Sequence, residues 1–183
     1  MRRIPITVFF ALLMAIGVPA VYGQQSSADE AQIGTREELA QLLNRVGPSI
    51  KVAFRQSQKQ PFTFVGLMNE GLTTSESLEI VISVSAKQTI HFRIYPRYKG
   101  GYINVNKAKN GVGLMRQLLQ FSNQNFLFWG TDDTADVFAG YTFTLESGFP
   151  EAALTIVLRS ISNLDKFVGD MKPAIEGSSP NGQ

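Results

Sequence analysis

Residues 78–95, LEIVISVSAKQTIHFRIY, decide the fold of this chain. From Leu78 to Val84, apolar residues occupy every second position, a pattern typical of a β-strand with one buried face. The alternation resumes after Ala86-Lys87, with one apolar side and one polar side (Ile90, Phe92 and Ile94 against His91, Arg93 and Tyr95). A connection this short indicates an antiparallel hairpin.

Outward from this hairpin, further elements are predicted on both sides. Strands are indicated at 50–54, 62–68, 126–129 and 137–145, helices at 35–46, 109–121 and 150–172, a polar connector at 55–61, and strand ends at Pro96 and Gly100-Gly101. Thr35 and Glu38 match a capping box, and Gly47-Pro48 is a typical helix end. The order is one helix, three or four strands, a helix, two strands and a helix. It favours an α+β fold with helices packed on an antiparallel sheet.

Two apolar segments in the second half of the chain allow more than one interpretation. The helix at 109–121 has a predicted apolar face, which consists of Leu114, Met115, Leu118 and Leu119. The run from Phe126 to Trp129 is apolar on both faces. It is either a central strand of the core or a strand with one face exposed to a partner.

The two ends of the chain have the composition of processed or unstructured segments. Residues 1–23 combine Arg2 and Arg3 with an uncharged apolar run and small residues before Gly23, which predicts a signal peptide cleaved between Gly23 and Gln24. An uncleaved anchor is the alternative. We further expect a flexible leader at 24–34, a single domain at 35–172 and a disordered tail at 173–183. The expected location is the periplasm or the exterior of the cell.

The composition argues against several classes of chemistry. The chain has no cysteine, which excludes disulfides and thiolate ligands. Without the signal peptide, fifteen basic residues balance fifteen acidic ones, so nothing favours nucleic acid. His91 is the single histidine and has no carboxylate near it in sequence. Asp132, Asp133 and Asp136 lack the spacing of a calcium loop and suit a turn. We expect no catalytic residues, no metal and no cofactor.

Charge is divided unevenly along the middle of the chain. Residues 87–116 hold seven basic and no acidic residues, whereas 117–158 hold five acidic and no basic ones. The division indicates either a surface that orients a charged partner or neighbouring strands that neutralise each other. Tyr95, Tyr98 and Tyr102 lie among the basic residues, and tyrosine is frequent at interfaces. The candidate partner surface consists of Arg93, Arg97, Tyr98, Lys99 and Trp129.

Five segments from residue 100 onward are GGYINVNKAKN, LLQFS, NFLFWG, VFAGYTFTL and ESGFPEAALTIVLRSISNLDKFV. Together they resemble the YbjN family. The family's asparagine-bearing junction is matched by Asn104, Asn106 and Asn110, and its glycine-containing entry into the last helix by 148–151. The resemblance covers residues 35–171 and implies a fold similar to the small chaperones of type III secretion. The export signal and the polar segment 55–61 depart from the family.

The resemblance implies a regulatory or chaperone-like role without an enzymatic centre. We therefore expect a non-catalytic exported adaptor that binds a protein partner and that forms a homodimer, as the chaperones it resembles do. One alternative is a binder of a small molecule or envelope ligand, with the aromatic strand lining a pocket and Arg93 or Arg97 meeting an anion. Another is a hydrolase that uses His91 with a distant carboxylate.

Overall fold

The protein is an α+β structure built on one antiparallel sheet. The computed structural model describes residues 22–177, so the expected signal peptide lies outside the described residues except for Tyr22 and Gly23. The elements are α1 (Tyr22–Val46), η1 (Gly47–Ile50), β1 (Arg55–Gln56), β2 (Thr63–Met68), β3 (Ser77–Ser85), β4 (Thr89–Tyr98), β5 (Gly101–Tyr102), α2 (Gly111–Gln124), β6 (Phe128–Thr131), β7 (Val137–Thr144), α3 (Glu151–Ser160), η2 (Ile161–Leu164) and α4 (Asp165–Glu176). The strand order is β1-β2-β3-β4-β7-β6, with β5 beside β4.

The predicted central hairpin is present as β3 and β4. Their register places Ile80 opposite Ile94 and Ile82 opposite Phe92. All four of these side chains are at most 1% exposed. Directly opposite residues share a face of the sheet, so the period-two pattern of the sequence becomes one continuous apolar surface.

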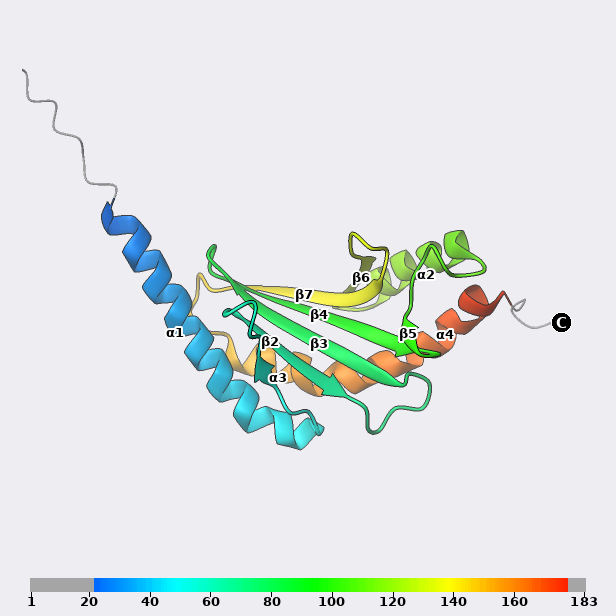
Figure 1. Ribbon diagram of the computed structural model, residues 1–183, viewed down its shortest axis with the longest axis horizontal. Helices are drawn as coiled ribbons and strands as arrows, with labels where there is room; N and C mark the ends of the chain where they lie inside the picture. Colours follow the sequence, from blue (N-terminus) through cyan, green and yellow to red (C-terminus); the bar gives the residue numbers. More distant parts are fainter. Residues whose placement is uncertain (1–21, 178–183) are drawn as a thin grey trace, which may run out of the picture.

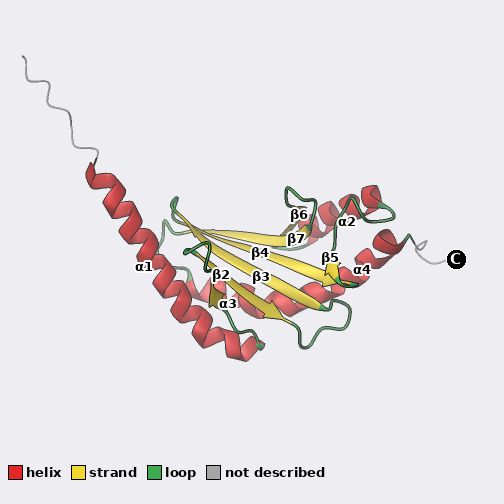
Figure 2. Ribbon diagram, in the orientation of Figure 1, coloured by secondary structure: helices red, strands yellow, loops and turns green. Residues whose placement is uncertain are grey.

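Helices cover only one of the two faces of the sheet. Figures 1 and 2 show α3 and α4 passing behind the strands, with α1 across one end and α2 beside β6. Burial along β3 and β4 alternates strictly between buried and more exposed positions over most of each strand. The core therefore lies between the sheet and the helices, and the opposite face carries no helix of the described chain. We call this second surface the open face.

The first helix begins earlier than the sequence predicts. Residues 24–34, expected to be a flexible leader, belong to α1, which therefore passes through the supposed capping box at Thr35 without a break. The segment contains no proline, and alanine, glutamine and glutamate favour helix. Gln32 also donates a hydrogen bond to the Val84 carbonyl over 2.9 Å, which fixes this part of the helix to the sheet.

The last helix also differs from the prediction, in both its continuity and its end. It is divided into α3, η2 and α4, and α4 continues past Pro173 to Glu176 rather than stopping there. Two backbone hydrogen bonds hold this end in place, from Lys109 N to Ile175 O and from Asn110 N to Ala174 O. Residues 178–183 of the expected tail lie outside the described residues.

Two strand predictions need correction. The expected strand at 50–54 is instead the end of η1 followed by a loop, in which Lys51 has φ of +56°. Pro96 does not end β4, which runs on to Tyr98. β7 pairs with β4 only as far as Ile94, and the carbonyl of Pro96 faces Ile103 N at 3.4 Å. The missing N–H of the proline therefore deprives no neighbouring strand of a hydrogen bond.

The helix α2 buries only part of its predicted apolar face. Leu114 and Leu118 are buried together with Phe121, whereas Met115 is 38% and Leu119 67% exposed. The Asn110 side chain caps this helix by accepting a hydrogen bond from Gly113 N over 2.8 Å. The buried stripe of α2 is therefore narrower than the apolar face that the sequence predicts.

The apolar run at 126–129 is not a central strand. It leads into β6, which pairs only with β7 and forms an edge of the sheet. The free side of this edge is partly closed by α2, because Ser122 Oγ accepts a hydrogen bond from Trp129 N at 2.7 Å. Edge strands that expose unpaired backbone groups favour aggregation, so Ser122 protects this edge.

Replacing Ser122 by alanine should leave the backbone N–H of Trp129 without an acceptor. We expect the free energy of unfolding to fall by about 2 kcal/mol, measured by urea denaturation. Ser122→Thr keeps the hydroxyl and should lose less than half as much. Equal losses in the two variants would mean that packing, and not the hydrogen bond, is what the serine provides.

Candidate functional site

The open face carries a connected group of aromatic and arginine side chains. In the sheet, Arg93 is paired with Val81, Tyr95 with Glu79 and Tyr102 with Arg97. This pairing places Arg93, Tyr95 and Tyr102 on the open face. Phe138 belongs to it as well, since it is only 6% exposed yet lies apart from the core beneath the helices. The group consists of Arg93, Tyr95, Arg97, Tyr102, Phe128 and Phe138, and we call it the aromatic–arginine group.

The rings and guanidinium groups of this group pack against one another. The centroid of Phe138 lies 5.7 Å from that of Tyr95 and 5.7 Å from that of Phe128. Tyr95 is in turn 5.8 Å from Tyr102. The guanidinium carbon of Arg93 lies 4.9 Å from the Phe138 centroid, a distance at which a cation is attracted by the ring. These contacts form one continuous surface across β4, β5, β6 and β7.

A glycine in β7 makes room for one of these rings. A β-carbon at Gly140 would lie 2.5 Å from the ring of Phe128, which covers the backbone there. Gly140 pairs with both Arg93 and Phe128 in the sheet. The absence of a side chain at this position therefore makes room for the Phe128 ring.

Both arginines remain available to a partner. Arg97 lies over Tyr102, with its guanidinium carbon 5.2 Å from the ring centroid. Within residues 22–177, the salt bridges involve neither Arg93 nor Arg97. Stacking on a ring orients the planar guanidinium while its N–H groups stay free to bind carboxylates.

Glu79 is an acidic side chain beside the aromatic–arginine group, and it accepts a hydrogen bond from a tyrosine. Tyr102 donates a hydrogen bond from its hydroxyl to Glu79 Oε2 over 2.6 Å. This hydrogen bond, followed by burial, raises the pKa of Tyr102 to about 12. A hollow of about 210 Å³ adjoins the pair and is lined by Arg55, Val65, Leu67, Glu79 and Arg97 among others. The hollow extends the aromatic–arginine group toward β2.

The structure separates the five residues of the predicted partner surface into three places. Arg93 and Arg97 lie together on the open face. Tyr98 and Lys99 are at the end of β4, where Tyr98 donates a hydrogen bond to Glu176 and Lys99 Nζ lies 2.8 Å from the same carboxylate. Trp129 is only 4% exposed and lies on the helix side of the sheet. The prediction that Trp129 belongs to the partner surface is therefore wrong.

The predicted partner surface did not include Phe138 or Leu67. It also left out Tyr102, although the sequence places this tyrosine among the basic residues. Leu67 is 46% exposed and Tyr102 37% exposed. Side chains alternate between the two faces along each strand, and residues directly opposite Arg93 or Arg97 share their face. This alternation was the available signal. Using that signal requires the register between strands, which the hydrophobic pattern of a single strand does not contain.

His91 also lies on the open face, bonded to two threonines. Its Nε2 is 2.8 Å from Thr89 Oγ1, and its Nδ1 is 3.0 Å from Thr142 Oγ1. Burial, together with the charge of Arg93, lowers the pKa of His91. Both ring nitrogens are occupied by hydroxyl groups, so neither faces a carboxylate that would orient the imidazole for general base catalysis.

Asp132, Asp133 and Asp136 lie in the turn between β6 and β7. Asp132 Oδ1 accepts hydrogen bonds from Thr134 N and Asp136 N, each over 3.0 Å. Burial would raise the pKa of Asp132, but these hydrogen bonds and that from the Thr134 hydroxyl keep it below its usual value. Among the residues described, no three histidine, aspartate or glutamate side chains are placed to hold a metal ion. The carboxylate of Asp132 therefore stabilises the turn.

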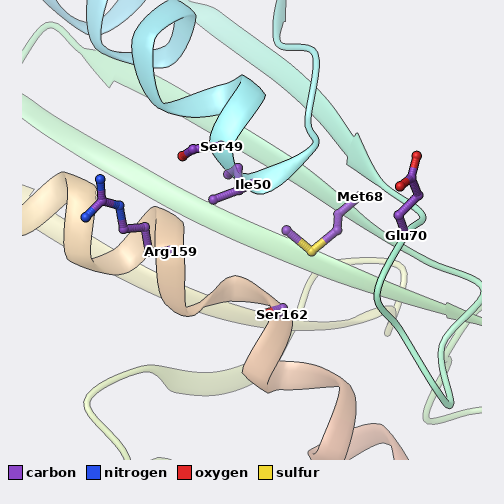
Figure 3. A pocket seen from close by; sticks show the side chains of 6 residues that line it. All are labelled: Ser49, Ile50, Met68, Glu70, Arg159 and Ser162. Carbon is purple, nitrogen blue, oxygen red and sulfur yellow. The ribbon is translucent and has the colours of Figure 1, made fainter.

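A second hollow, of about 340 Å³, lies between η1, the end of β2 and the junction of α3 with η2. Figure 3 shows Arg159 and Glu70 at opposite ends of it, with Ile50 and Met68 between them. Lys51 Nζ lies 2.9 Å from Glu70 Oε2, so that carboxylate already has a cation beside it. The polar groups of this hollow do not converge on one point, unlike those of the open face.

The fold and the open face define an α+β protein with a helix-free, aromatic and arginine-rich sheet surface. No known protein family matches the chain, and a search of curated proteins found no significant relative. The resemblance to the YbjN family therefore stays a prediction. Of the helices within 22–177, none is both long and apolar enough to span a bilayer.

Proposed function

We propose that this protein is a non-catalytic, exported binding module that recognises another polypeptide with its open face. The observation that carries the proposal is the aromatic–arginine group, in which Arg93 and Arg97 are held over rings and form no ion pair with the described residues. Tyrosine and arginine dominate the energetics of protein interfaces. The role is that of an adaptor, chaperone-like protein or regulatory module, as the YbjN resemblance implies.

The chemistry of the open face indicates what kind of segment it binds. Leu67 and Phe128 offer exposed apolar surface, 46% and 45% exposed respectively. The arginines supply oriented donors for carboxylates. A segment with acidic and apolar side chains in alternation would satisfy both, because its side chains would meet the donors and the apolar surface in turn. A partner of this composition is our proposal.

Site-specific photo-crosslinking in the periplasm tests this function. A photoreactive phenylalanine analogue at Leu67 should capture a polypeptide, whereas the same group at Ile156 should not. Ile156 is a matched control because it is also apolar and is 66% exposed, but lies on α3. Nuclease-sensitive products, equal capture at both positions, or no capture at Leu67 would contradict the proposal. A product containing only a second copy of this chain would make the open face a dimer interface and would also contradict the adaptor role.

The two arginines should determine the yield of that crosslink. We expect the Arg93→Gln/Arg97→Gln variant to reduce capture at Leu67 by about tenfold or more, the size of a hot-spot loss. Lys107→Gln/Arg116→Gln removes the same charge from exposed positions outside the open face and should change the yield less than twofold. If the control variant loses as much as the arginine variant, net charge, and not the aromatic–arginine group, determines binding.

A further inference from the structure

A small cavity lies on the helix side of the sheet, beside the edge strand β6. Its volume is about 120 Å³, and its lining includes Phe126, Trp129, Asn163, Lys166 and Phe167. The centroid of the Trp129 ring is 5.7 Å from that of Phe167 in α4 and 5.9 Å from that of Phe121 in α2. The cavity lies between the segment that leads into β6, the end of α3 with η2, and the start of α4. It is on the opposite side of the sheet from the open face.

The indole N–H of Trp129 is a donor that the described chain leaves unpaired. The Trp129 side chain is only 4% exposed, and its Nε1 atom is buried without a hydrogen-bond partner. Buried polar groups almost always have a partner, and an exception in a folded protein needs an explanation. Trp129 is also one of the residues that line the cavity.

A positive charge lies at the same cavity. Lys166 is exposed, and its Nζ is 4.8 Å from the centroid of the Phe167 ring. Among the described residues, the salt bridges do not include Lys166. The cavity therefore combines aromatic walls, a buried N–H donor and an ammonium group that has no carboxylate partner in the described chain.

We propose that this cavity binds a short apolar group that carries a carboxylate. The carboxylate would accept hydrogen bonds from the Trp129 indole and from Lys166, and the apolar part would pack against Phe126 and Phe167. Pockets for drug-sized ligands have volumes of about 300 Å³ or more. This cavity is smaller, which limits the ligand to a few carbon atoms. A free short-chain acid and the carboxyl-terminal residue of a peptide share this chemistry.

Trp129 provides the readout, because it is the only tryptophan of the chain. The purified protein is titrated with hexanoate, with a tetrapeptide that ends in leucine, and with the amide of each, while tryptophan fluorescence is recorded. We expect a saturable change with at least one of the two carboxylates and at least tenfold weaker binding of its amide. A response to hexanoate alone identifies a free acid, and a response to the peptide alone identifies a chain end.

Matched lysine variants distinguish this site from a general effect of charge. Lys166→Gln should weaken binding about tenfold, in keeping with the loss of a charge-assisted hydrogen bond. Lys172→Gln should leave binding unchanged. Lys172 is on the same helix as Lys166, but its Nζ lies over the ring of Tyr98 and not at the cavity. No saturable change with either carboxylate, equal binding of acid and amide, or equal weakening by the two variants would overturn the proposal. None of these outcomes depends on whether the open face binds a polypeptide.

Discussion

Replacing Asp165 by asparagine should lower the free energy of unfolding by about 3 kcal/mol at pH 7, the cost of unmade hydrogen bonds to a buried charged group. Asp165 is 5% exposed and begins α4. Its Oδ2 accepts hydrogen bonds from Thr73 N over 2.6 Å and from the Thr73 hydroxyl over 2.7 Å, and its Oδ1 accepts one from Ser75 N over 2.6 Å. The asparagine amide would present a donor where the backbone already presents donors.

The wild-type protein should also lose stability in acid because of this carboxylate. Burial acts to raise the pKa of Asp165, but the hydrogen bonds from Ser75 and Thr73 outweigh it and lower the pKa to about 2 from a usual value of 3.8. A depressed pKa in the folded state stabilises the protein above pH 3.8, and this contribution is lost as the pH falls from about 4 to 2. Linkage makes the loss about 2 kcal/mol.

Denaturation by urea between pH 2 and pH 7 measures both effects. The Asp165→Asn variant should lack the part of the acid destabilisation that belongs to this residue, so the two curves should approach each other toward pH 2. Asp170→Asn is the matched control, because Asp170 is an exposed aspartate on the same helix. A constant difference between wild type and the Asp165 variant across this range would show that the carboxylate charge plays no part in holding the 73–75 loop.

The class of the fold was predictable because local patterns determine it. The alternation from Leu78 to Ile94 requires two strands with one buried face, and the short link at residues 86–88 requires an antiparallel pair. The short link also fixes the register of β3 with β4, and a shift of that register by one residue would expose every apolar side chain. The antiparallel α+β class is confirmed on these grounds.

The neighbours of each strand could not be predicted in the same way. Trp129 and Phe128 are adjacent, yet one lies against the helices and the other on the open face. Which ring lies on which side depends on the pairing of β6 with β7, and that pairing joins segments of different hydrophobic patterns. The sequence therefore indicated partner contacts at Trp129, whereas in the structure Phe128 is the exposed one of these two rings.

The helix ends were mispredicted because tertiary contacts override local signals. Pro173 lacks an N–H and usually ends a helix, but backbone bonds from Lys109 and Asn110 to Ile175 and Ala174 keep the last turn in place. Residues 24–34 look like a polar linker, but one hydrogen bond from Gln32 and an uninterrupted helix to Val46 order them. In both segments, the local sequence alone is a weak indicator of where the helix begins or ends.

Asn104→Asp should destabilise the protein by about 4 kcal/mol at pH 7, because it places a carboxylate at a buried position beside the partly buried carboxylate of Asp136. Asn104 is 9% exposed, and its amide donates hydrogen bonds to Asp136 Oδ1 over 2.7 Å and to Thr134 O over 2.8 Å. These bonds join the segment before α2 to the turn between β6 and β7. An aspartate would face two acceptors and could donate to neither.

The penalty for Asn104→Asp should shrink as the pH falls. Two carboxylates at hydrogen-bond distance cannot both ionise readily, so the pair retains one proton and its apparent pKa rises. A raised pKa in the folded variant stabilises it below the usual pKa near 4, and this contribution disappears as the pH increases. The difference in unfolding free energy between wild type and variant should thus be smaller at pH 4 than at pH 8. Asn106→Asp, at an exposed position two residues on, should change stability by less than about 0.5 kcal/mol at either pH. A penalty for Asn104→Asp that is independent of pH would mean that the lost amide donor, and not the paired charges, accounts for the whole effect.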